Sequence, residues 1–274
     1  MTVTTGTPQV PGRRRDLFVR FALVVSLALP VFLVVAALGT RFGLWPWTIG
    51  LGVLTMQIGS MWLMAAAAIG LLALVVAVAV KPRRGWVAAL VAIAVPAGGL
   101  AYGNSVRQVA TSLPPIHDIS TNPDLPPLFS DAVMAQRATA FNGNPVLPPN
   151  ENITAFSRDN VTPFSGRSFA ELQREAYPGI QPVLLTGVTV ADAHAKAKEA
   201  ATALGWAIVT DDVASGRLEA VETSFWFGFK DDIVVMISQD GAGVRVDARS
   251  VSRVGRSDLG MNAKRLEAFL ERMQ

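Results

Sequence analysis

The stretch GVRVDARSVSRVGRSDLGMN, residues 243–262, decides the fold of the C-terminal part of the chain. Side chains alternate over its first nine residues, which predicts a strand at 243–251 with an apolar face and a charged face. Gly255 allows a turn. Ser257 then serves as the N-cap of a final helix over 257–272, and Asp258 falls in its first turn, where the helix dipole favours an acid. The stretch therefore predicts a strand-to-helix junction.

Similar sequence signals before this junction predict that it belongs to a domain over residues 188–274. A capping box at Thr189 and Asp192 begins a helix that ends before Gly205. Runs typical of strands follow at 206–210, 217–227, 233–238 and 243–251. The order α-β-β-β-β-α predicts an α+β domain with an antiparallel sheet and both helices packed on one side.

The N-terminal third is too apolar for a soluble domain. Apolar residues make up 51% of the chain and charged ones 16%, and the excess lies in runs at 17–39, 49–80 and 85–103. Each run is long enough to cross a bilayer. A cleaved signal peptide is the alternative for the first run, which is longer than a typical signal and leads into further spans. We therefore expect a three-helix membrane anchor over 17–103.

Charge distribution predicts the topology. Arginines cluster at 13–15 and basic residues at 81–84, and short basic flanks stay in the cytoplasm. We expect a cytoplasmic N-terminus (1–16) and, after three spans, a periplasmic C-terminal domain on a bacterial inner membrane. Residues 104–274 carry 16 basic and 20 acidic side chains, which argues against a nucleic-acid partner.

Proline residues recur between the anchor and the domain. They predict a Pro-rich arm or linker over 104–187, with two short helices at 130–138 and from Ser168 to the residue before Pro178.

Few residues point to chemistry. The chain has no cysteine, which excludes disulfides and thiolate chemistry. His117 and Asp118 supply two metal-ligand types without a third, and a turn that packs the arm on the domain is the alternative reading. We expect His194 at a position of its helix that borders the solvent-exposed face. The sequence has no local hydrolase signature, so we predict no catalytic residue. We also predict no metal site and no cofactor. Enzyme activity stays open, and a protein without enzyme activity is favoured.

One polar group near the C-terminus is the candidate ligand site or structural network. Its members are Asp231, Asp232, Arg249, Ser250, Ser252, Arg253, Ser257, Asp258 and Asn262. Guanidinium groups on an open sheet face suit carboxylate or phosphate ligands. Cross-strand ion pairs on a solvated or partner-covered face are the structural alternative.

Four segments carry a resemblance to a known family. They are TRFGLW (40–45), PIHDIST (115–121), FWFGFKDD (225–232) and the junction at 249–262. They resemble the family catalogued as domain of unknown function 1499, in its membrane-anchored bacterial branch. The resemblance covers most of the chain and implies no activity.

The combined prediction is a membrane-anchored periplasmic binding or protein-interaction module of the cell envelope. Its expected partners are the lipid bilayer and other envelope proteins. A binder of an anionic small molecule or lipid headgroup, acting through the arginine-bearing sheet face, is the first alternative. An uncharacterised hydrolase is the second.

Overall fold

The computed structural model describes residues 12–139, 146 and 163–274. Most of the predicted N-terminal segment and the middle of the predicted arm lie outside the described residues. The chain divides into two compact units, Met1–Arg107 and Gln108–Gln274, which are described separately.

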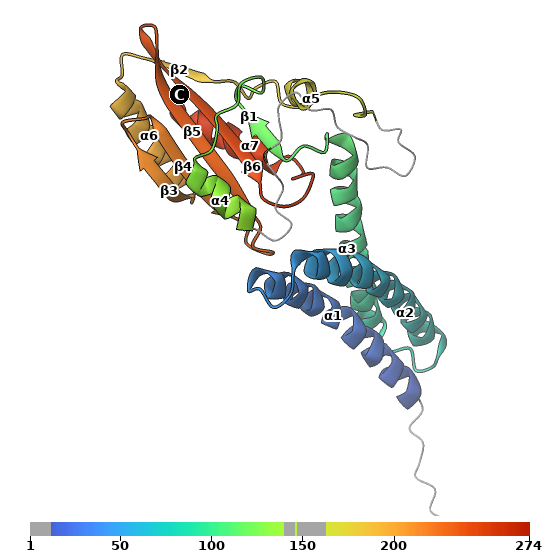
Figure 1. The fold of residues 1–274 in the computed structure, drawn as a ribbon. Helices are drawn as coiled ribbons and strands as arrows, with labels where there is room; N and C mark the ends of the chain where they lie inside the picture. Colours follow the sequence, from blue (N-terminus) through green and yellow to red (C-terminus); the bar gives the residue numbers. More distant parts are fainter. Residues whose placement is uncertain (1–11, 140–145, 147–162) are drawn as a thin grey trace, which may run out of the picture. The chain divides into compact units, whose positions relative to one another are not determined.

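The first unit is helical (Figure 1). Its elements are α1 (Arg13–Arg41), the π-helix η1 (Thr48–Gly59), α2 (Ser60–Ala79) and α3 (Trp86–Ser112), the last of which continues into the second unit. The three predicted apolar helices are confirmed, since α1, η1 with α2, and α3 are each long and apolar enough to cross a membrane. Pro96 lies inside α3 without ending it.

Small side chains let the helices of this unit approach closely. Its buried cluster consists of Val19, Ala22, Ala73, Ala77, Ala89 and Ala92. Ser26 Oγ donates a hydrogen bond to the Ala92 carbonyl at 2.6 Å, which links α1 to α3. Larger apolar side chains point outward, as at Val24 and Val31, which are 64% and 63% exposed. Helices in lipid show this pattern, because the bilayer and not the protein interior receives the large side chains.

Arg15 joins the two basic clusters of the sequence. Its side chain is buried and donates hydrogen bonds to the carbonyls of Val80, at 3.2 Å, and Pro82. The start of α1 and the loop after α2 therefore lie at the same end of this unit.

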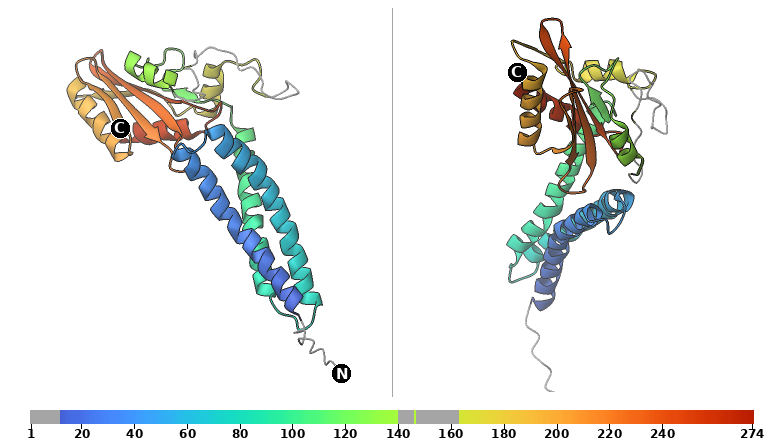
Figure 2. Two further views of the ribbon diagram at one scale, coloured as in Figure 1. Left: turned by 60° about the horizontal axis from the view of Figure 1, so that its bottom comes forward. Right: turned by 60° about the vertical axis from the view of Figure 1, so that its left-hand side comes forward.

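The second unit is a six-stranded antiparallel sheet with helices on both faces (Figures 1 and 2). Its strands are β1 (Asp118–Ser120), β2 (Val183–Thr186), β3 (Ala207–Asp212), β4 (Arg217–Thr223), β5 (Lys230–Asp240) and β6 (Gly243–Ser252). Its helices are α4 (Asp131–Thr139), α5 (Phe169–Ala176), α6 (Val190–Ala203) and α7 (Met261–Met273). The predicted α+β class with an antiparallel sheet is confirmed.

The sheet contains two strands more than the four expected. β1 and β2 come from the stretch predicted as an arm or linker, and both pair with β6. Ser120 lies opposite Arg249, and Val183 lies opposite Val246, so the two short strands share one edge of β6. Strands of three and four residues among prolines are too short to show an alternation of apolar and polar side chains. They become strands because they pair with β6.

The two faces of the sheet bury different elements. The main core packs α6 and α7 against Ile233, Val235 and Ile237 of β5, and Trp206 stacks on Phe269 of α7 at 5.3 Å. The opposite face carries α4, whose Val133 packs with Phe129, Val234 and Val251. The expected placement of α6 and α7 on one side is therefore observed, and α4 covers the other side.

Helix starts follow the sequence in two cases and differ in a third. Both expected capping boxes are formed, at the start of α5 and of α6. The last helix, however, begins at Met261 after Gly260, whose φ is 80°. Ser257 is therefore not its N-cap. Asp258 contacts its first turn instead, accepting a hydrogen bond from the amide nitrogen of Asn262. The predicted strand at 217–227 likewise ends early, at Thr223.

We predict that Phe269→Ala destabilises the second unit by about 3–5 kcal/mol, because Phe269 is fully buried and its loss leaves a cavity beside Trp206. Thermal unfolding of the detergent-solubilised chain measures this effect. Lys264→Ala, at an exposed position of the same helix, is the control and should unfold like the unaltered chain. Equal stability of the two variants would contradict this packing.

Candidate functional site

The candidate residues gather at one end of β6 but lie on two sides of the sheet. Strand alternation puts Asp232, Arg249 and Arg253 on the face under α4. It puts Asp231, Ser250 and Ser252 on the face under α7. We call the first group, with Arg137 and Asp118, the Asp232 cluster. The second group, with Asn262 and Arg265, is the Asn262 cluster.

Asp232 is fully buried and holds two arginines from different elements. Its carboxylate accepts a hydrogen bond from Arg137 Nη1 of α4 at 2.6 Å. It also accepts bonds from Arg253 Nη2 at 2.7 Å and Nε at 2.9 Å. A carboxylate removed from water requires such partners, because an unpaired buried charge is strongly unfavourable. The two arginines that bind Asp232 therefore connect α4 and the segment after β6 to β5.

Arg249 forms a second ion pair in the same cluster. It is 1% exposed, and its Nε and Nη2 donate to the two oxygens of Asp118 at 2.9 and 2.6 Å. Nη1 donates to the carbonyl of Pro127 at 3.1 Å. The part of the predicted arginine-bearing face that holds Arg249 and Arg253 is thus buried, and Arg249 binds the chain's own groups.

Three guanidinium groups face two carboxylates in the Asp232 cluster, so one positive charge is not matched by a carboxylate within it. The ring of Phe129 lies 5.8 Å from the guanidinium carbons of both Arg137 and Arg249, a distance suited to cation–π attraction. Arg137 also donates to the carbonyls of Val251 and Ser252 at 3.2 and 3.1 Å. Burial lowers the pKa of Arg137, and the hydrogen bond to Asp232 opposes that shift.

The Asn262 cluster joins α7 to the sheet. Asn262 Oδ1 accepts from Ser250 Oγ at 2.6 Å, and its Nδ2 donates to Ser252 Oγ at 2.9 Å and to the His117 carbonyl at 3.0 Å. Arg265 Nη2 donates to Asp231 at 2.7 Å. Every polar atom of the buried Asn262 side chain is therefore paired, which suits a structural role.

Ser257 lies outside both clusters, and Asp258 contacts the Asn262 cluster only through the backbone amide of Asn262. Ser257 is exposed, and its Oγ accepts from the Leu259 amide at 3.3 Å. Burial raises the pKa of Asp258, while hydrogen bonds from the amides of Asn262 and Gly260 oppose the shift. The nine candidate residues are therefore not one site, and ligand binding by them stays a prediction.

Sequence reasoning missed Arg137 and Arg265 as members of the clusters. Arg137 follows the buried Val133 by four residues, and Arg265 follows the buried Asn262 by three. Helical positions at those spacings share a face. An arginine three or four residues from a buried position of the same helix was therefore the sequence feature that could have identified both residues.

Two further side chains hold the segments that cover the sheet. Glu219 is fully buried and accepts from Ser130 N and Ser130 Oγ at 2.6 Å each, just before α4, and from Thr210 Oγ1 at 2.7 Å. Gln173 of α5 accepts from the Ser120 amide at 3.0 Å and donates to the Ser120 carbonyl. The Gln173 side chain therefore makes the two hydrogen bonds to the Ser120 backbone that a neighbouring strand would otherwise make beside β1.

His194 is buried, contrary to its expected place beside the surface. Its Nε2 lies 2.8 Å from Asp211 Oδ1, and Lys198 Nζ lies 2.6 Å from Asp211 Oδ2. Lys198 and, secondly, His194 lower the pKa of Asp211. Among the described residues, no three histidine or acidic side chains are grouped so as to hold a metal ion.

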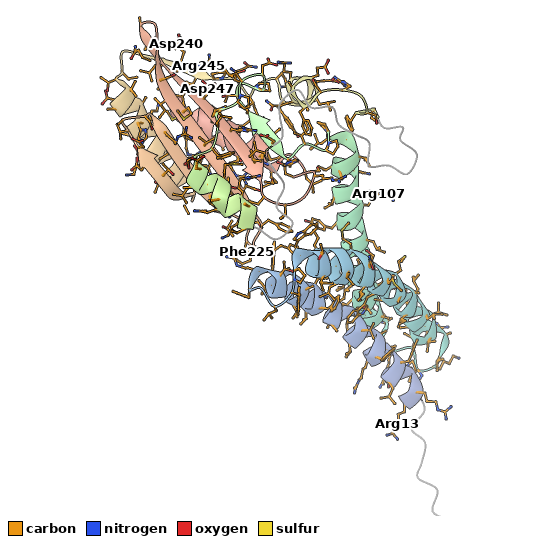
Figure 3. All side chains as sticks on the ribbon, viewed as in Figure 1. Arg13, Arg107, Phe225, Asp240, Arg245 and Asp247 are labelled. Carbon is orange, nitrogen blue, oxygen red and sulfur yellow. The ribbon has the colours of Figure 1, made fainter. Side chains whose placement is uncertain are left out.

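A surface pocket of about 250 Å³ lies away from both clusters, between the segment after β1, the end of α5 and β6. Its lining includes Arg174 and Arg245. Arg174 pairs with Asp124, and Arg245 Nε donates to Asp247 Oδ2 at 2.6 Å. Figure 3 shows Arg245 and Asp247 close together on the sheet. Pairing with Asp247 raises the pKa of Arg245.

A family model described as "protein of unknown function (DUF1499)" matches residues 118–273. The matched range begins with β1 and ends with α7, so it coincides with the whole sheet and its covering helices. A search of curated proteins gave no match.

We predict that Asp232→Ala destabilises the second unit by about 3–5 kcal/mol, because it leaves Arg137 and Arg253 buried without their carboxylate. In a domain of this size, that loss lowers Tm by about 10 °C or more. Glu175→Ala breaks an ion pair with Arg167 at the surface and is the matched control, for which we expect little change. A similar Tm for both variants would mean that Asp232 does not hold the layers together.

Proposed function

The chain belongs to the DUF1499 family, and we propose that it is a membrane-anchored binding or interaction module of the bacterial cell envelope. One observation carries the proposal. Only residues 113–117 separate α3, a helix long enough to span a bilayer, from β1 of the sheet domain. A connection this short keeps the domain close to the membrane in which α3 is held.

The proposed topology has the N-terminus in the cytoplasm and residues 108–274 in the periplasm. It is supported by the contacts of Arg15, which join the basic start of α1 to the basic loop after α2. Both clusters then stay on the same, cytoplasmic side. Three spans carry the chain to the other side of the membrane.

The outer surface of the domain is the proposed contact region, because Arg249 and Arg253 of the predicted face are engaged inside. Leu125 and Leu128, between β1 and α4, are 78% and 71% exposed. Pro126 and Pro127 lie between the two leucines and limit the backbone freedom that binding would remove. Exposed leucines on such a segment suit contact with another envelope protein.

Reporter fusions and cross-linking in cells test this proposal together. A phosphatase that is active only in the periplasm should be active when fused after residue 274 and inactive when fused within residues 81–84. A photo-reactive amino acid at Leu125 should give a discrete adduct with a second protein, whereas one at Lys264, exposed on α7, should not. An inactive C-terminal phosphatase contradicts the topology, and equal labelling at both positions contradicts the contact region.

The pocket beside Arg245 supports a second candidate, a binder of a small anionic molecule. Its arginines are already paired with Asp124 and Asp247, so a carboxylate or phosphate ligand has to compete for their donors. The hydrolase alternative has less support, since His194 bonds Asp211 and not a serine hydroxyl.

Thermal shifts distinguish the second candidate. If the pocket binds anions, inorganic phosphate or citrate should raise the Tm of the detergent-solubilised chain, because a ligand that binds only the folded state stabilises it. Arg245→Ala should abolish the rise, and Lys264→Ala should keep it. The same rise in both variants, or none in the unaltered chain, excludes this pocket as the anion site.

A further inference from the structure

An aromatic turn projects from the hairpin of β4 and β5. The turn FWFGF, residues 225–229, connects the two strands. Phe225 is 67% exposed and Trp226 is 52% exposed. Figure 3 places Phe225 at the end of the sheet opposite to Asp240. Two large adjacent rings exposed at a turn form an apolar patch of the kind that marks a protein or membrane contact.

The turn is held in shape by its own hydrogen bonds. The Ser224 amide donates to the Phe229 carbonyl at 2.8 Å, and the Phe229 amide donates to Ser224 Oγ at 2.9 Å. Phe225 and Trp226 pack edge to face with 5.0 Å between ring centres, and Phe227 stacks on Phe229 at 5.5 Å. The exposed rings are therefore presented by a defined loop, which reduces the entropy lost when they bind.

The strand register puts this turn at the end of the sheet where the chain enters the domain. Val251 of β6 lies opposite Asp118, the first residue of β1, and also opposite Asp232 of β5. Just after β6, the Arg253 amide donates a hydrogen bond to the Lys230 carbonyl of β5 at 2.9 Å. The entry to β1 and the base of the aromatic turn are thus separated sideways by about 10–15 Å, from strands spaced about 4.8 Å apart.

The connection to α3 limits how far this end can lie from a bilayer. Beyond the expected span at 85–103, residues 104–112 of α3 add about 14 Å, and residues 113–117 reach at most about 18 Å when fully extended. The other end of β5, at Asp240, is about 35 Å further along the strand. In a chain anchored through α3, the connection therefore restrains the end that carries the aromatic turn more closely than the far end.

We propose that Phe225 and Trp226 insert into the interface of the bilayer that holds the chain's own helices, and so fix the sheet domain on the membrane by its entry end. The inference rests on the proposed membrane anchor. Tryptophan and phenylalanine are side chains that amphipathic segments place at the lipid–water boundary. Lys230, exposed at the base of the turn, supplies a cation for anionic headgroups.

A bilayer fits this surface better than a protein partner does. A specific protein interface needs a complementary surface of on the order of 1,200–2,000 Å² around such anchors, whereas rings at the lipid–water boundary need only the boundary itself. Insertion of a few rings is weak by itself, but the covalent connection makes it an intramolecular event at high effective concentration. The two rings are therefore sufficient for a tethered domain.

The absence of cysteine from the whole sequence allows a direct test. The full chain, as Phe225→Cys labelled with an environment-sensitive fluorophore, is reconstituted in phosphatidylcholine–phosphatidylglycerol vesicles with or without shallow spin-labelled lipid. We expect the spin label to quench most of the fluorescence. Ala242→Cys, exposed in the β5–β6 turn at the opposite end of the sheet, is the matched control and should keep its fluorescence.

A second variant asks whether the remaining ring contributes. Trp226→Ser in the labelled Phe225→Cys chain should reduce the quenching, while Lys264→Ala should leave it unchanged. Absence of quenching at position 225, or equal quenching at 225 and 242, overturns the insertion.

Alkaline extraction of the same vesicles separates failure of the insertion from failure of the anchor. A chain that stays in the pellet without quenching at 225 keeps the anchor and loses the insertion. A chain released by alkali overturns both.

Discussion

Neutralising charge that is buried at one end of β6 is the constraint on which the layers of the domain depend. Asp232 is removed from water inside the sheet, and the guanidinium groups that balance it come from α4 and from the segment after β6. Asp118 and Arg249 repeat this arrangement across the edge between β1 and β6. Each ion pair therefore connects segments far apart in sequence, and removing a carboxylate leaves buried guanidinium groups without the ion pair that offsets their burial.

This constraint also directs the functional conclusion. A row of arginines on an exposed strand is typical of an anion site, whereas Arg249 and Arg253 lie under α4 and their donors bond the protein itself. The outer surface then remains for recognition. Among the described residues of the domain, the three most exposed large apolar side chains are Leu125 and Leu128, after β1, and Phe225, in the aromatic turn of the β4–β5 hairpin. The proposed partners, another envelope protein and the bilayer, follow from the different chemistry of these two places.

Local signals predicted much of the architecture. The alternation in residues 243–251 gave β6, and the capping boxes at Thr189 and Ser168 gave the starts of α6 and α5. Signals were absent where pairing alone creates structure, as in β1 and β2. They misled at Ser257, because a serine before an acid resembles an N-cap although the chain makes another turn first. For the candidate site, the sequence identified most of the polar residues but not their separation onto two faces.

The sequence by itself determined the apolar helices, the antiparallel α+β class and the group of polar residues near the C-terminus, because each depends on the spacing of residues along a local segment. The tertiary structure decided that Arg249 faces Asp118 in the interior and that Arg137 reaches Asp232. It also decided that the aromatic turn shares an end of the sheet with the entry of the chain. These relations depend on strand register and layer packing, which join residues about a hundred positions apart.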